Sequence, residues 1–221
     1  MSDRDHPIDV QGAADRLVQA GAPGATARVD DGSQVRQAAS GVADLRTGRP
    51  MQPDLHFRAG SITKSFVAAL VLKLVSEDAL SLEDTVDRWL PGILSSGDRV
   101  TIRQLLNHTA GVPQYTDIVW RELYASPQGR FRTWSPRELV DLVAGRPLDF
   151  PPGTAWSYSN TGYVVLGLIV EEAAGTSLDR ELARRIFERS SCTIRPCRSA
   201  PSSSPAPPRA ATAPHSVRNS R

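Results

Sequence analysis

The sequence of 221 residues predicts an α/β fold of the α+β kind, in which helices pack a partial antiparallel sheet and an all-helical lobe is inserted at about residues 80–150. Three patterns carry this prediction: a helical stripe followed by a hairpin signal, an apolar helix that begins near residue 61, and amphipathic stretches separated by Pro and Gly. An apolar content of 40% is enough for a sizeable core.

The first elements are a helix and a hairpin. Apolar residues between positions 10 and 18 recur on one helical stripe, which ends where Gly and Pro follow. Two segments, 25–29 and 34–39, then flank the turn sequence Asp30-Asp31-Gly32. This pattern favours two antiparallel strands.

The later elements are mainly helical. A turn at residues 47–50 leads to His56-Phe57-Arg58, where we expect a short extended segment before the next helix. Residues 164–174 have the composition of a buried helix. Between them, the amphipathic stretches of the predicted lobe are 82–90, 102–106 and 136–144.

Ser61-Ile62-Thr63-Lys64 opens the apolar helix. On a helix, an offset of three residues places the Ser61 hydroxyl and the Lys64 amine on the same face, one turn apart. Lys64 is one of two lysines beside 24 arginines, and a desolvated lysine can release its proton, whereas arginine cannot. The pattern indicates a nucleophile beside a base. The alternative interpretation is that Ser61 is simply an N-cap residue.

Four segments, taken in their order along the chain, resemble the serine β-lactamase and penicillin-binding protein superfamily. The resemblance is greatest to the class C β-lactamase and D-alanyl-D-alanine carboxypeptidase branch, which also contains esterases, and it runs from about Val10 to Glu188. The segments are Phe57-Arg58-Ala59-Gly60-Ser61-Ile62-Thr63-Lys64-Ser65, Leu105-Leu106-Asn107-His108-Thr109-Ala110-Gly111-Val112-Pro113, Pro152-Gly153-Thr154 and Tyr158-Ser159-Asn160-Thr161-Gly162-Tyr163.

The resemblance implies a β-lactamase/transpeptidase-like fold and a serine hydrolase. Ser61 would be the acylated nucleophile, Lys64 would hold its proton network, Tyr158 would be the general base or proton shuttle, and Asn160 would donate to the substrate amide. The expected substrate is a small amide or ester, such as a β-lactam or a D-Ala-D-Ala peptide, and no metal or organic cofactor is needed. For Tyr158 and Asn160 the alternative is a loop aromatic beside a turn amide.

Other catalytic interpretations have less support in the sequence. His108 could suggest a Ser-His-Asp triad, but no Gly-x-Ser-x-Gly elbow accompanies it. We therefore expect His108 to serve packing and hydrogen bonding in a turn after a helix. No His/Asp/Glu cluster has the spacing of metal ligands, which argues against a metallo-β-lactamase.

A third motif of the family, Lys-Thr-Gly or His-x-Gly on a later strand, has no match after Asn160. Arg46-Thr47-Gly48 precedes the nucleophile, and we interpret it as a turn. The motif's strand would supply a cation and an oxyanion-hole amide, and loss of one such donor typically lowers the rate by about 10²–10³. We therefore keep a second hypothesis, that this is a catalytically inactive, C-terminally truncated member without its last strands.

Residues 190–221 differ from the hydrolase-like part, 1–189. They hold eight serines, six prolines and five arginines and no acidic residue, a composition that predicts a disordered tail. The spacing of Cys192 and Cys197 is a weak metal or disulfide signal, and we interpret it as accidental. Because the family's helix pattern stops abruptly, we hypothesise a frameshift near Arg189.

Charge and hydropathy exclude several classes of partner. A formal charge of +2 and the lack of a basic patch with interleaved aromatics argue against nucleic acid. No run approaches the roughly 18 apolar residues of a membrane span. The start of the sequence has no apolar signal region, so we expect a cytoplasmic protein as written, although members of the family are often exported.

Overall fold

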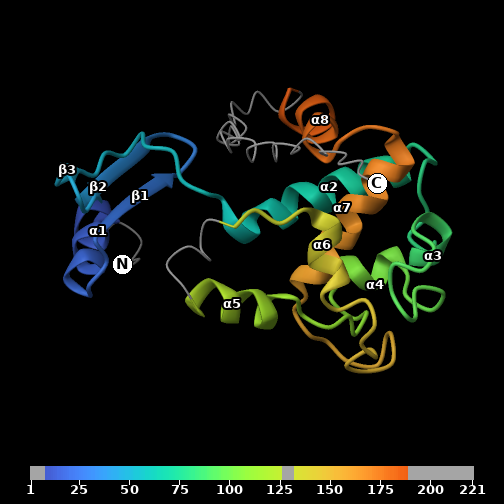
Figure 1. The fold of residues 1–221 in the computed structure, drawn as a ribbon. Coiled ribbons are helices and arrows are strands. Elements are labelled where there is room, and N and C mark those ends of the chain that lie inside the picture. The colour runs from blue at the N-terminus through green and yellow to red at the C-terminus, as the bar shows by residue number, and fades with distance from the viewer. Residues whose placement is uncertain (1–7, 126–131, 189–221) are drawn as a thin grey trace, which may run out of the picture. The chain divides into compact units, whose positions relative to one another are not determined.

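The chain divides into two compact units after Gly60 (Figure 1). The computed structural model describes residues 8–125 and 132–188. The predicted tail at 190–221, with Cys192 and Cys197, therefore lies outside the described residues.

The first unit is a helix against a small sheet. Helix α1 (Val10–Gln19) is followed by strands β1 (Gly24–Asp30), β2 (Val35–Asp44) and β3 (Arg49–Pro50), which form an antiparallel sheet in the order β1-β2-β3. The helix lies on one face of β1 and β2 (Figure 1). The core between the helix and the sheet consists of small apolar residues: Val10, Ala14 and Ala38 are buried, with Ala25, Ala27 and Val29 packed against them.

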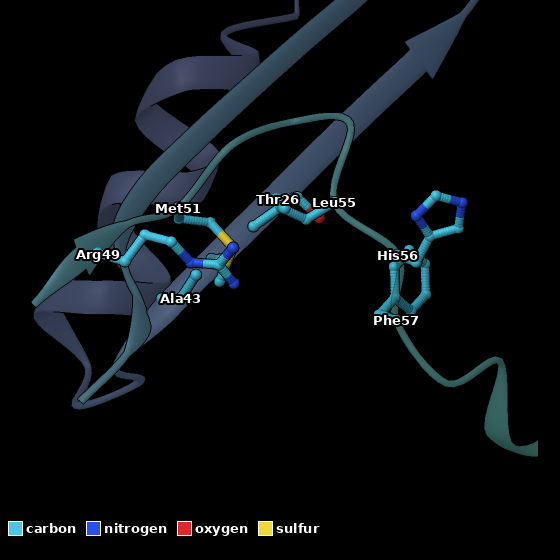
Figure 2. Close-up of a pocket in the computed structure, with 9 residues that line it drawn as sticks. Thr26, Ala43, Arg49, Met51, Leu55, His56 and Phe57 are labelled. Carbon is cyan, nitrogen blue, oxygen red and sulfur yellow. The ribbon is translucent and has the colours of Figure 1, made fainter. Parts of the chain in front are cut away.

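A cavity of about 290 Å³ opens on this first unit (Figure 2). Strand residues such as Thr26 and Ala43 line it together with Met51, His56 and Phe57 from the segment that follows β3. All of the lining residues belong to the first unit, and none is a candidate site residue.

The second unit is helical. Its central helices α2 and α7 lie side by side (Figure 1) and are apolar along much of their length, which accounts for the fully buried Leu70, Val71, Leu166 and Ile169. The elements are η1 (Gly60–Ile62), which spans the unit boundary, α2 (Thr63–Ser76), α3 (Val86–Trp89), α4 (Ile102–Leu106), α5 (Thr116–Ala125), α6 (Pro136–Asp141), α7 (Asn160–Ala174), α8 (Leu178–Leu182) and the π-helical turn η3 (Ala183–Phe187).

The buried carboxylate of Glu181 and the guanidinium of Arg185 together link α8 and η3 to the end of α2. The Glu181 side chain is 1% exposed and accepts hydrogen bonds from Arg184 and Arg185, and Arg185 also pairs with Glu77. Burial alone would raise the pKa of Glu181, but the hydrogen bonds from Arg185 and Arg184 outweigh it and the pKa lies below its ordinary value. The last described elements are therefore anchored by charge as well as by apolar packing.

The predicted fold class is confirmed: a partial three-stranded antiparallel sheet accompanies helices in a β-lactamase/transpeptidase-like fold. The first helix, the hairpin and the apolar helix occur where the patterns placed them. Two expectations need correction. The stretch 82–90 is helical only at 86–89, and the buried helix begins at Asn160, because Ser159 caps it there.

Candidate active site

Ser61 lies in the short turn η1, directly before α2. The N-cap residue of α2 is Ile62, and no side chain caps this helix. The interpretation of Ser61 as an N-cap is therefore wrong, because its hydroxyl makes its contacts elsewhere. Gly60 precedes it with φ at +55°, in the left-handed region that glycine adopts readily.

The Ser61 hydroxyl lies between two groups that can exchange protons with it. Tyr158 OH is 2.8 Å from Ser61 Oγ, and Lys64 Nζ is 3.4 Å from the same atom. The structure thus brings together the serine and lysine of one helix start with a tyrosine that is 97 residues away in sequence. A hydroxyl held in this way is suited to nucleophilic attack if one neighbour accepts its proton.

Asn160 completes the group through Lys64. Its side-chain oxygen accepts a hydrogen bond from Lys64 Nζ at 2.7 Å, so the amide NH₂ group is left to donate elsewhere. Lys64 Nζ also lies 4.7 Å from the ring centre of Tyr158 and 5.6 Å from that of Tyr163. The ammonium is therefore surrounded by the serine, the amide and two aromatic rings.

This arrangement shifts the acidity of Tyr158. Hydrogen bonds from Lys64 and with Ser61 hold the pKa of the Tyr158 phenol below its usual range, because both favour the phenolate. The side chain is 38% exposed, so solvent reaches it. Burial and the neighbouring Tyr158 raise the pKa of Tyr163, which separates the two phenols in acidity.

Helix α7 places Tyr158 and Asn160 on either side of its N-cap. Ser159 is the cap: its Oγ accepts the Gly162 N–H at 3.0 Å and donates to the Val112 carbonyl at 3.3 Å. Because Asn160 is the first residue of the helix, it is fixed relative to α7 and not part of a loose loop.

His108 binds the segment 157–159 through both its backbone and its side chain. Its carbonyl accepts the Ser157 N–H at 3.0 Å, and its Nδ1 accepts the Ser159 N–H at 3.1 Å. The imidazole also packs against Tyr158, with ring centres 4.7 Å apart. Burial lowers the pKa of His108, and the positive charge of Lys64 lowers it further. The expected role in packing and hydrogen bonding matches these contacts.

Gln114 is a supporting residue that sequence reasoning missed. Its side-chain NH₂ donates to the Tyr158 carbonyl, and its Oε1 accepts the Asn160 N–H at 3.0 Å. A glutamine in a loop has no chemical signature of its own. The one available signal was its position directly after the segment 105–113, which carries the resemblance.

Within residues 8–125 and 132–188, no three His, Cys, Asp or Glu side chains gather as metal ligands would. In the same described residues, no helix is long and apolar enough to cross a membrane.

Comparison with known proteins gives consistent matches. The family model described as Beta-lactamase matches residues 10–218. Penicillin-binding protein 4* of Bacillus subtilis is 37% identical over 155 residues, which are 66% of this chain and 32% of that protein. Esterase EstB of Burkholderia gladioli is 38% identical over 156 residues, 66% of this chain and 40% of the esterase.

Among solved structures, a D-stereospecific amidohydrolase from Streptomyces sp. matches with a TM-score of 0.74 and 34% identity. The match covers 82% of this chain and 54% of the amidohydrolase. The chain thus spans less than half the length of the two curated relatives and about half that of the solved structure.

Proposed function

The chain belongs to the Beta-lactamase family of serine hydrolases, and on this basis we propose that Ser61 forms an acyl-enzyme with a small amide or ester, which water then hydrolyses. One observation carries the proposal. Ser61 Oγ lies within hydrogen-bond reach of both Tyr158 OH and Lys64 Nζ.

Tyr158 is the proposed general base. Its oxygen is nearer to Ser61 Oγ than the Lys64 amine is, and Lys64 lowers the pKa of its phenol. The Tyr158 phenolate takes the Ser61 proton as Oγ bonds to the substrate's carbonyl carbon. Tyr158 then returns that proton to the leaving nitrogen or oxygen as its bond to carbon breaks. Lys64 stabilises the phenolate by its hydrogen bond and its charge.

Asn160 is the proposed substrate-binding residue. Lys64 occupies its side-chain oxygen, which fixes the amide orientation and presents the NH₂ group as a donor. A carbonyl next to the scissile bond is the acceptor that such a donor fits. This role requires a substrate with an amide in its acyl part.

The relatives point to the substrate class. They are a penicillin-binding protein, an esterase and a D-stereospecific amidohydrolase. The first name describes binding of a β-lactam, and the other two describe hydrolysis of an ester and of an amide. We extend that class to this chain: a β-lactam, a D-Ala-D-Ala peptide or another small amide, or an ester. No metal or organic cofactor takes part in the proposed reaction.

The test is the intact mass of the purified 221-residue chain after incubation with a penicillin. Opening of the β-lactam ring joins the whole penicillin to Ser61, so the expected mass increase equals the mass of the drug. The Ser61→Ala variant should show no increase. Ser65→Ala is the matched control, because Ser65 is an exposed serine on the same helix, and it should be labelled normally.

The alternative hypothesis, a catalytically inactive truncated member, predicts a different result. A protein that melts cooperatively by circular dichroism but gains no mass from a penicillin or from an activated ester would contradict the proposal. Labelling without release of the acyl group would place the defect in the hydrolysis step alone.

A further inference from the structure

His108 lies behind the proposed base and takes no part in the reaction described above. It follows α4 and has a left-handed backbone, with φ at +64°, which is uncommon outside glycine. Two of its atoms, the carbonyl oxygen and Nδ1, bind the backbone amides on either side of Tyr158. The residue therefore contacts the Tyr158 segment through its backbone and its ring.

The bond from Ser159 determines the protonation state of this imidazole. An imidazole nitrogen that accepts a hydrogen bond carries no proton. Since Nδ1 accepts the Ser159 N–H at 3.1 Å, His108 must be neutral, with its one ring proton on Nε2. The lowered pKa of His108 agrees with this state.

Protonation of His108 is incompatible with the contact. Both ring nitrogens of an imidazolium are donors, so Nδ1–H would face the Ser159 N–H, one donor against another. The charged and titratable groups that face the ring are Lys64 from α2 and Tyr158 and Tyr163 from the α7 side. No carboxylate among the described residues hydrogen-bonds to His108, so nothing there would offset a second positive charge beside Lys64.

We infer that His108 is a positioning residue for Tyr158 and that it works only when neutral. In this state it holds residues 157–159 so that the Tyr158 hydroxyl reaches Ser61. When the imidazole gains a proton in acid, the Ser159 bond breaks, the segment is released, and acylation fails. The effect on acylation rests on the proposed function, whereas the effect on the Tyr158 segment does not.

Two substitutions separate the hydrogen bond from the charge. In His108→Asn, the side-chain oxygen takes nearly the position of Nδ1 and can accept the Ser159 N–H, but it does not titrate. Asparagine also tolerates a left-handed backbone better than most residues. In His108→Ala the acceptor is lost. The control is His56→Asn, at an exposed histidine of the first unit.

The first readout is the acylation rate as a function of pH. Below the pKa of Tyr158 the rate should fall about tenfold per pH unit, because the base is being protonated. Below the pKa of both groups the wild type and His56→Asn should fall more steeply, by up to about 10² beyond the single-proton fall, because a second proton binds to His108 and breaks its contact. His108→Asn should keep the single slope, and His108→Ala should lose about 10² in rate at every pH. A steep limb that persists in His108→Asn would overturn the inference.

The second readout needs no activity. In ¹⁵N NMR, the Nδ1 signal of His108 should be that of an unprotonated acceptor. The Ser159 amide and the Tyr158 ring signals should move with the same midpoint as the His108 ring, and this midpoint should vanish in His108→Asn. If no variant is acylated but these signals titrate together, the proposed function fails and the positioning role stands. If they do not move with His108, the positioning role is wrong.

Discussion

Tyr158 OH lies 2.8 Å from Ser61 Oγ, whereas Lys64 Nζ lies 3.4 Å from the same atom. By geometry, Tyr158 is the better acceptor for the serine proton because it is nearer. Lys64 lowers the pKa of the Tyr158 phenol, so more of the phenolate is present to accept that proton. This difference supports the proposed roles, proton transfer for Tyr158 and electrostatic support for Lys64, and substitutions can test each role separately.

Replacing Tyr158 by Phe should lower the rate of Ser61 acylation by about 10²–10⁴, because general base catalysis contributes about that much. The ring that packs on His108 is retained, so the melting temperature should change little. The measurement is the rate of mass increase with a penicillin. As a control, Tyr163→Phe removes only a hydroxyl that donates to the Leu106 carbonyl, and acylation at near wild-type rate is expected. Equal losses in the two variants would argue against Tyr158 as the base.

Replacing Lys64 by Met should raise the pKa of Tyr158 toward its ordinary value, because the hydrogen bond and charge that favour the phenolate are removed. A lowered pKa means that the phenolate forms at lower pH in the wild type, so the acylation profile of the variant should move to higher pH. Phenolate absorbance, taken as a difference from Tyr158→Phe, measures this pKa directly. Lys73→Met is the control: Lys73 pairs with Glu77 at the other end of α2, and its loss should leave the profile in place.

Replacing Gln114 by Glu should separate its two hydrogen bonds. The carboxylate can still accept the Asn160 N–H, but it cannot donate to the Tyr158 carbonyl. Because a misplaced catalytic group can lower a rate by up to about 10², we expect a fall in kcat with a smaller change in KM. Steady-state kinetics with an activated ester give both constants. A KM effect alone would mean that Gln114 acts on substrate binding through Asn160.

Replacing Glu181 by Ala should destabilise the second unit by about 1.5–3 kcal/mol, because it removes the hydrogen bonds from Arg184 and Arg185 to a buried carboxylate, while Arg185 keeps its pair with Glu77. Urea denaturation at neutral pH measures the loss, and Glu172→Ala, at an exposed glutamate of α7, should stay within about 0.5 kcal/mol of wild type. The folded-state pKa of Glu181 is lowered. Its contribution is therefore present above the ordinary glutamate pKa and is lost as pH falls through the folded value. A wild-type stability that does not change over that acidic range would contradict this account.

The Ser61 and Lys64 part of the site could be predicted because contacts between residues close in sequence follow from helix geometry. The three-residue offset of Ser61 and Lys64 is local, and the structure confirms that their polar atoms meet. Tyr158 lies 97 residues away from Ser61, so no spacing rule reaches it and only the resemblance to a family placed it beside the serine. The catalytic roles of these three residues stay predictions.

The remaining features depended on packing that local patterns do not contain. Helix α5 was not predicted; it has no buried residue and contributes no side chain to the core of the second unit. Helix α7 begins at Asn160 because the Ser159 hydroxyl caps it, although Ser and Asn together are typical of a turn. Gln114 contributes through two hydrogen bonds to backbone groups, and such contacts carry no signal in side-chain chemistry.

The cap at Ser159 also determines where its two neighbours, Tyr158 and Asn160, lie around the axis of α7. Successive residues of an α-helix are turned by about 100° around its axis. A single residue inserted between Ser159 and Asn160 would therefore swing the amide away from Lys64, while leaving Tyr158 beside Ser61. The proposed base Tyr158 and the proposed substrate-binding Asn160 would therefore have to be transferred between related proteins together with Ser159, as one unbroken segment.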